Sequence, residues 1–168
     1  WLVEVGPGLD IAFPDTMTFH TGDGAIVTAL SPRCLQLMRR AGCGIMPRVS
    51  NIDPVGNWEG DAAGELLRDQ AAQVRFVENL VTHLKAYGAI GANIDIESLG
   101  PQDASAYVDF LSLLASVLHR HGLYLTVDIP LDEEAYDPEA IAQVADAVVL
   151  MAYDEHYGTG APGPIASL

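Results

Sequence analysis

Short apolar runs alternate with amphipathic segments along most of the chain. Five such runs are each bounded by Gly, Pro, Asn or Asp, and they predict β-strands at residues 9–13, 45–50, 90–97, 123–129 and 147–153. Segments with helical spacing separate most of these strands. This order predicts a parallel sheet wrapped by helices.

The helices are predicted by starts, apolar faces and stops that agree with one another. Ser31 and Pro32 are typical of a helix start, and Gly42 of its end. A second helix ends at Gly88 and a third at Gly122. The apolar stripes of these two are Val74, Val77, Val81 and Leu84 in the second, and Tyr107, Phe110, Leu111, Leu114, Val117 and Leu118 in the third. A shorter helix is predicted at residues 138–145, and residues 16–28 are predicted as a hairpin excursion outside the strand–helix repeat.

This strand–helix repeat is too short to close a barrel. Eight strands with their helices need about 250 residues, and the chain has 168. We therefore expect an α/β fold that is a partial TIM (β/α)8 barrel. Residues 1–168 are expected to form one fragment of a single catalytic domain, with units missing at both ends.

The strand at residues 90–97 carries the main chemical signal. Alternate residues point to opposite sides, so Asn93, Asp95 and Glu97 share one face while Ile94 and Ile96 share the other. Burying neighbouring carboxylates costs free energy unless they are paired or share a proton. A like charge two residues away raises the pKa of one carboxyl group, which suits a proton donor at neutral pH. The alternative is a structural network.

In the functional interpretation Glu97 is the acid, because it lies nearest the carboxyl end of the strand, where barrel active sites are found. In the structural interpretation Arg48 is the counter-ion that holds the acidic pair. At the end of the strand at 147–153, Met151 and Tyr153 share a face. Asp154 has the opposite parity and joins them only if the strand has already given way to a loop.

Two motifs resemble glycoside hydrolase family 18. The family's fourth strand has the form Asp-x-x-Asp-x-Asp-x-Glu and its sixth strand carries Met-x-Tyr-Asp. Residues 90–97 read Ile-Gly-Ala-Asn-Ile-Asp-Ile-Glu, and residues 151–154 read Met-Ala-Tyr-Asp. Residues 153–167 further resemble bacterial members such as spore-cortex lytic enzymes and modules joined to polysaccharide deacetylase or glycosyltransferase domains. The resemblance spans nearly the whole chain and implies that the five strands are the second to sixth of the barrel.

The resemblance also implies roles for individual residues. The counterpart of Glu97 protonates the glycosidic oxygen while the acetamido oxygen of the substrate attacks the anomeric carbon. Asp95 would orient and polarise that acetamide, and Tyr153 would donate a hydrogen bond to it. Met151 and Asp154 would shape the subsite, giving a hydrolase for polymers that contain N-acetylglucosamine.

Departures from the chitinase motif concern the first two acidic positions. Ile90 and Asn93 stand where the family has aspartates, which removes charges that help Asp95 change its protonation state. Asn93 is retained as a candidate substrate-binding residue, and activity on crystalline chitin is not expected. Trp58 lies on a loop after the strand at 45–50, where an indole can stack on a sugar ring. Asp128 lies near the end of the strand at 123–129, on the same face as Thr126, and we assign it no role.

Composition narrows the class of partner. The chain has 23 acidic and 8 basic residues, a net charge of −15, which argues against nucleic acid, anionic membranes and polyanionic sugars. We expect a polysaccharide or oligosaccharide substrate, possible further catalytic modules in the parent protein, no cofactor and no metal. Two cysteines are too few for a disulfide framework. Localisation outside the cytoplasm or at the cell envelope is expected from the family resemblance alone.

Two other functions compete with this prediction. A metal-dependent barrel hydrolase would gather Asp95, Glu97, Asp128, Asp154 and His156 as ligands; a requirement for a divalent metal would favour it. A catalytically silent sugar-binding module of the same fold is the third class. Retention of Glu97 argues against it, because lectin-like relatives commonly lose the acid.

Overall fold

The structure is a computed structural model that describes residues 8–131, 133–153, 156 and 160–166. Its main sheet has six strands in the order β3-β2-β5-β6-β7-β8, and all neighbours are parallel except β2 and β3. Two further strands, β1 and β4, pair in parallel beside it. The strands are β1 (Ile11–Ala12), β2 (Asp15–Thr18), β3 (Val27–Thr28), β4 (Gly44–Ile45), β5 (Arg48–Ser50), β6 (Gly91–Asp95), β7 (Tyr124–Pro130) and β8 (Ala147–Met151).

The helices follow the predicted starts and stops. They are α2 (Pro32–Ala41), α3 (Gly60–Arg68), α4 (Gln70–Tyr87), the short 3-10 helix η2 (Pro101–Asp103), α5 (Ala104–Arg120) and α6 (Pro138–Val144). The Ser31 hydroxyl accepts a hydrogen bond from the Cys34 amide at the start of α2. Gly42, Gly88 and Gly122 all have positive φ, which confirms the predicted stops.

One helix was not predicted. In α3 the residues Ala62, Ala63, Leu66 and Leu67 are buried, which is helical spacing. Only Asp69 separates α3 from α4, and its side chain accepts from the amides of Ala71 and Ala72. Because the two helices join through this single cap residue, no Gly or Pro marks the boundary between them.

The first two predicted strands are each interrupted. The strand predicted at 45–50 is divided into β4 and β5 around Pro47, and the strand predicted at 9–13 is shortened to β1 and resumes as β2 after Pro14. A proline has no amide hydrogen for the ladder. The hairpin predicted at 16–28 is present as the antiparallel pair of β2 and β3. The hairpin is also part of the main sheet, because β2 pairs in parallel with β5.

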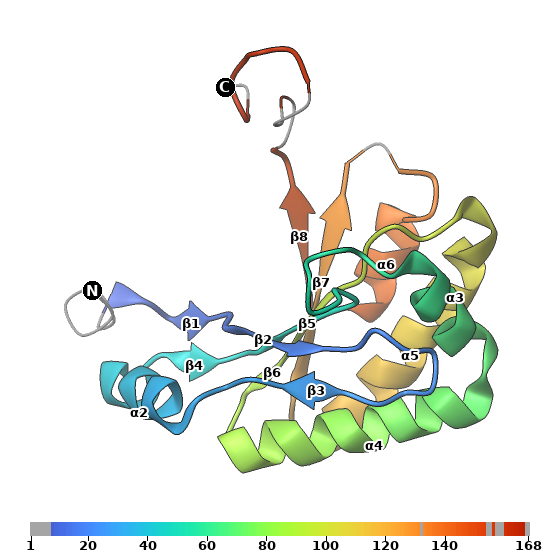
Figure 1. Cartoon of the computed structure of the whole chain (residues 1–168). Coiled ribbons are helices and arrows are strands. Elements are labelled where there is room, and N and C mark those ends of the chain that lie inside the picture. Colours follow the sequence, from blue (N-terminus) through green and yellow to red (C-terminus); the bar gives the residue numbers. More distant parts are fainter. Residues whose placement is uncertain (1–7, 132, 154–155, 157–159, 167–168) are drawn as a thin grey trace.

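The main core lies between the sheet and the helices α3, α4, α5 and α6, which Figure 1 shows together beside the sheet. We call this helix-covered side the outer face and the opposite side the inner face. Ile94 and Ile96 are fully buried in the outer-face core, together with Val127 and Ile129. The alternation predicted for β6 is thus confirmed, and it leaves Asn93 and Asp95 on the inner face.

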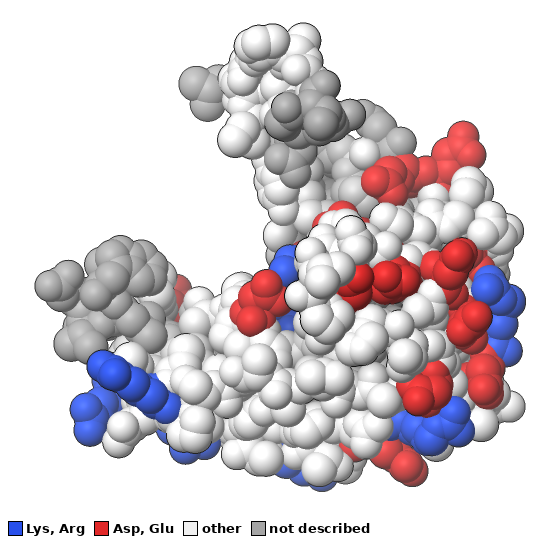
Figure 2. Space-filling model, in the orientation of Figure 1, with Lys and Arg blue, Asp and Glu red and all other residues white. Residues whose placement is uncertain are grey.

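A smaller cluster of Met38, Cys43 and Ile45 lies under α2, beside β4. Both cysteines are free thiols, Cys34 half-buried and Cys43 buried. Figure 2 shows acidic side chains gathered at the right of the view and basic ones over α2 at the lower left. Among the helices described, none has the length and apolar character that crossing a bilayer requires.

Candidate active site

The inner face of β6 holds a buried ion pair. Asp95 has a side chain only 1% exposed, and one of its oxygens, Oδ2, accepts a hydrogen bond of 2.5 Å from Nη1 of Arg48. Arg48 also bonds Asp15 on β2 through Nη2, at 2.7 Å. One guanidinium thus links three neighbouring strands, β2, β5 and β6. The counter-ion of the structural interpretation is present.

Asn93 belongs to a second chain of polar contacts on the same face. The Thr126 hydroxyl donates to Oδ1 of Asn93 at 2.6 Å, and Nδ2 of Asn93 donates to Oδ2 of Asp128 at 2.7 Å. All three side chains are buried. The side-chain amide of Asn93 therefore joins β6 to β7 through one hydrogen bond with Thr126 and one with Asp128. A cavity of about 230 Å³ on this face is lined by Phe13, Arg48, Asn93, Asp128 and Val149.

Burial dominates the electrostatics of the inner face. It raises the pKa of Asp95 to about 6; Asp128 and Asp15 raise this pKa further and Arg48 lowers it. Burial also raises the pKa of Asp128, against the hydrogen bond from Asn93 and the charge of Arg48. Burial lowers the pKa of Arg48, but its acidic partners outweigh burial and the net shift is upward. The raised pKa of Asp95 thus comes mainly from desolvation, and the acids that add to it, Asp128 and Asp15, lie on other strands. The predicted effect of a like charge two residues away, between Asp95 and Glu97, stays a prediction.

Glu97 lies two residues beyond the end of β6, at the mouth of the sheet. The Nδ2 atom of Asn51 donates to the Glu97 carbonyl oxygen at 2.8 Å, and the Glu97 amide donates to Oδ1 of Asn51 at 2.9 Å. Just beyond, Ser98 has a positive φ of 61°. A Cβ atom added to Gly60 would lie 2.0 Å from the Ser98 carbonyl oxygen, so the start of α3 packs directly on this turn.

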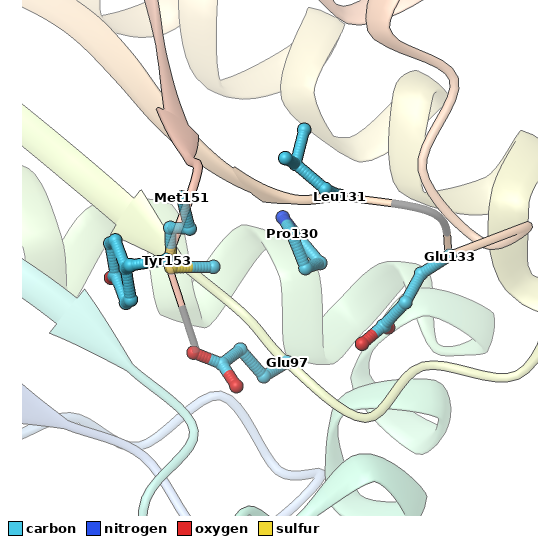
Figure 3. Close-up of a pocket in the computed structure, with 6 residues that line it drawn as sticks. All are labelled: Glu97, Pro130, Leu131, Glu133, Met151 and Tyr153. Carbon is cyan, nitrogen blue, oxygen red and sulfur yellow. The ribbon is translucent and has the colours of Figure 1, made fainter. Parts of the chain in front are cut away.

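A pocket of about 260 Å³ brings the predicted acid together with the end of β8. Its lining residues are Glu97, Pro130, Leu131, Glu133, Met151 and Tyr153. Figure 3 shows the Glu97 carboxyl group pointing toward the end of β8, with Glu133 on the other side of the opening. The Tyr153 side chain is about half exposed, at 51%. Glu97 thus shares one pocket with Met151 and Tyr153, which lie more than fifty positions later in the sequence.

The chain matches the family model described as glycosyl hydrolases family 18 over residues 26–168. This match covers most of the chain and includes both motif strands. The chain belongs to glycosyl hydrolases family 18.

Family 18 relatives and solved structures agree with this assignment. An uncharacterized glycosylase YvbX of Bacillus subtilis (strain 168) is 29% identical over 163 residues, 91% of this chain and 47% of the relative. The cortical fragment-lytic enzyme of Bacillus anthracis is 30% identical over 71% of this chain and 30% of its own length. The crystal structure of a chitinase from Chromobacterium violaceum ATCC 12472 superposes with a TM-score of 0.88 at 27% identity, over 98% of this chain and 55% of that one. The chain thus spans about half, or less, of the length of these proteins, and the partial barrel is the part of the family 18 fold that it contains.

Trp58, which is predicted to stack on a sugar ring, is half-buried and lies beside Arg48. Residue Ile52 forms an isolated antiparallel bridge with Trp58, and the guanidinium carbon of Arg48 lies 6.0 Å from the centre of the indole ring. This is the range of a cation–π contact. The indole therefore packs against the cation that binds Asp95. Asp154, predicted to shape the subsite, lies outside the described residues.

The metal-ligand set of the alternative prediction is not assembled by the residues that the structure describes. Among them, no group of three His, Cys, Asp or Glu side chains is placed to hold a metal ion. Nδ1 of His156 lies 2.8 Å from the Pro164 carbonyl oxygen, so that nitrogen donates to the backbone. Asp154, another residue of the predicted ligand set, lies outside the described residues.

Three polar residues around Glu97 are not predicted from the sequence, and neither are the pocket residues Pro130 and Leu131. Asn51 and Tyr136 contact the main chain around Glu97, and Glu133 lines the pocket. The position of Asn51 directly after a predicted strand was an available signal, because the carboxyl ends of parallel strands meet at one edge. For Tyr136 and Glu133 the loop after β7 offered no comparable pattern.

Proposed function

We propose that this chain carries the catalytic residues of a retaining glycoside hydrolase that cleaves polymers containing N-acetylglucosamine. The observation that carries the proposal is that Glu97, Met151 and Tyr153 line one pocket. The names of the relatives, a cortical fragment-lytic enzyme and a chitinase, support a peptidoglycan-like or chitin-like substrate. The net charge of −15 favours a neutral or cationic polymer.

In the first step of the proposed reaction, Glu97 donates its proton to the glycosidic oxygen. The bond between that oxygen and the anomeric carbon breaks, and its electron pair stays on the oxygen, which leaves as a hydroxyl group. The acetamido oxygen of the same sugar forms a new bond to the anomeric carbon. In the second step the Glu97 carboxylate takes a proton from a water molecule, which attacks the same carbon and opens the ring intermediate with overall retention.

Asp95 has the role of orienting and polarising the acetamide, and Tyr153 that of donating a hydrogen bond to it. The raised pKa of Asp95, about 6, supports a carboxyl group that exchanges its proton near neutral pH. Met151 and Asp154 shape the subsite, and Asn93 and Trp58 support binding. With Ile90 and Asn93 in place of two aspartates, the proposed substrate is a soluble or amorphous polymer rather than crystalline chitin.

We also propose that residues 1–168 are the second to sixth units of a longer catalytic barrel. The share of each relative that the chain covers, 47% in one and 30% in another, supports this. The proposed localisation is outside the cytoplasm or at the cell envelope, and the names of the relatives, a cortical fragment-lytic enzyme and a chitinase, support it.

The test is hydrolysis of a defined N-acetylglucosamine oligomer by the full-length protein that contains this chain. Glu97→Gln is expected to lower kcat by about 10²- to 10⁴-fold, the typical contribution of a general acid. Glu78→Gln, the same substitution on the exposed side of α4, is the control and is expected to leave kcat unchanged. Equal rates for wild type and Glu97→Gln would remove Glu97 from the mechanism.

The same assay separates the two competing functions. Loss of activity in chelator, restored by Mg²⁺ or Mn²⁺, would identify a metal-dependent hydrolase. An inactive wild-type protein that still binds the oligomer would identify a silent sugar-binding module. Activity that is insensitive to chelator and lost in Glu97→Gln supports the proposal.

A further inference from the structure

We propose that Asn51 and Tyr136 are positioning residues that fix the main chain on both sides of Glu97 and so fix where its carboxyl group enters the pocket. The inference rests on the proposed role of Glu97 as the acid. It adds two residues from separate loops, neither of which lines the pocket among the described residues.

The need for such residues arises where β6 ends. The last register pair with β5 is Ser50 with Asp95, and the last with β7 is Ile94 with Val127. Residues 96–99 therefore continue past the described ladder, with main-chain groups that need other partners. Ile96 and Leu99 are buried, so an unpaired amide or carbonyl there would be costly.

Asn51 supplies partners for Glu97 itself. It is fully buried, and its side-chain amide donates to the Glu97 carbonyl oxygen at 2.8 Å while accepting from the Glu97 amide at 2.9 Å. One side chain thus bonds both peptide groups that flank the Glu97 Cα atom. A primary amide is suited to this, because it carries a donor and an acceptor on one planar group.

Tyr136 holds the segment from the other side. Its hydroxyl donates to the Ile96 carbonyl oxygen at 2.8 Å and accepts from the Leu99 amide at 3.4 Å. Its side chain is buried, and burial raises the pKa of the phenol well above its usual value. The hydroxyl therefore remains a donor throughout any assay range.

Together the two side chains restrain rotation at Glu97. The peptide group between Ile96 and Glu97 is bonded at its oxygen by Tyr136 and at its nitrogen by Asn51. The following peptide group is bonded at its oxygen by Asn51. With both planes held, φ and ψ of Glu97 are restricted, and so is the direction in which its Cα–Cβ bond leaves the main chain toward the pocket. A displacement of about 1 Å at a catalytic group can cost on the order of 10²-fold in rate.

The test compares Tyr136→Phe with Tyr107→Phe in the full-length protein. Tyr107 is a matched control: its ring packs edge-on against that of Tyr136, with centroids 5.7 Å apart. Its hydroxyl is buried and has no hydrogen-bond partner among the described residues. Both variants remove one buried hydroxyl from the same aromatic pair, and only Tyr136→Phe releases the Glu97 segment.

We expect Tyr136→Phe to lower kcat on an N-acetylglucosamine oligomer by about 10- to 100-fold, with KM changed less than about twofold. Tyr107→Phe should retain wild-type kcat. A 4-nitrophenyl glycoside of the same sugar needs little help from an acid, because nitrophenolate leaves readily. On that substrate Tyr136→Phe should lose less than about threefold, a difference that a loss of folded protein cannot produce.

Two results would overturn the inference while leaving the proposed function intact. One is a Tyr136→Phe variant with the kcat of Tyr107→Phe, in a protein that Glu97→Gln still inactivates. The other is an equal loss on both substrates. If Glu97→Gln is fully active, the proposed function fails and the inference fails with it.

Should Tyr136→Phe yield too little folded protein, Asn51→Ser tests the same segment from the β5 side. Serine keeps a hydroxyl but cannot bond both peptide groups at once. The expected result is again a loss of kcat on the oligomer that largely disappears on the nitrophenyl substrate. Wild-type kcat for Asn51→Ser would contradict the inference.

Discussion

The two faces of β6 solve different problems with neighbouring residues. On the outer face Ile94 and Ile96 lie in an apolar core, fully buried and in contact with helices. On the inner face Asn93 and Asp95 are just as buried, yet their side chains form hydrogen bonds and an ion pair with polar and charged partners. The outer face stabilises the fold through area removed from water. The inner face keeps a carboxyl group in a place where its charge is costly.

Burial has opposite consequences for the two faces of β6. For the isoleucines burial is favourable at every pH, whereas for Asp95 it raises the pKa to about 6 and makes folding sensitive to pH. Substitutions on one face of β6 or the other separate the effect of apolar burial from the effect of the buried charge.

Ile94→Ala should have the largest effect on stability. Ile94 is fully buried, and truncating such a side chain typically costs about 2–5 kcal/mol. The loss should be nearly the same at pH 5 and pH 8, measured as the free energy of unfolding in urea. Val74→Ala, at a position 46% exposed on α4, should cost less than about 0.5 kcal/mol. A loss of unfolding free energy in Ile94→Ala that depends strongly on pH would contradict this expectation.

Arg48→Met should have an intermediate effect that depends on pH. Removing the cation leaves the Asp95 carboxylate buried without its partner, at a cost of roughly 1–3 kcal/mol after allowance for the partly exposed guanidinium. Without Arg48 the pKa of Asp95 rises further, so the loss should be larger at pH 8 than at pH 5. Arg33→Met, exposed on α2, serves as the control in the same unfolding measurement. An equal loss at both pH values would show that the ion pair is not its source.

Asp95→Asn should have the smallest effect, seen mainly as a change in slope. Because the folded pKa of Asp95 is raised from 3.8 to about 6, its contribution to stability is fully present below pH 4 and is lost as pH rises through 6. Asparagine does not titrate, so the variant should lose less stability than wild type between pH 4 and pH 7. The difference should be about 1–2 kcal/mol over this interval, and Asp128 should retain its own share of the slope. Asp109→Asn, exposed on α5, should follow the wild-type curve.

The outer face was the more predictable of the two from sequence. Apolar stripes indicate α4 and α5, and apolar runs indicate the strands β6, β7 and β8, because burial against one sheet leaves a regular pattern in the sequence. Ser31, Pro32 and Gly42 indicate α2 by its two ends. The interruptions at Pro14 and Pro47 were less visible. A proline at a strand end and a proline that divides a strand look alike until the partner strand is known.

The inner face was predicted in its residues but not in its contacts. The alternation of β6 placed Asn93 and Asp95 together, and Arg48 was considered as a counter-ion. The link from Arg48 to Asp15, and those from Asn51 and Tyr136 to the Glu97 segment, join residues 33 to 46 positions apart. Such contacts depend on where loops meet in space, and no local period encodes them.

The close approach of Gly60 to the Ser98 carbonyl has a practical consequence for mutational scanning. Any side chain at position 60 would have to push aside the turn that follows Glu97. A screen that scores only turnover would then rank this glycine with the residues that line the pocket, although glycine has no side chain to place there. Measuring protein abundance alongside turnover would not correct the ranking if the turn moves while the fold survives. A map of mutation-sensitive positions in this protein will therefore include Gly60, a residue whose role is to leave space for the main chain.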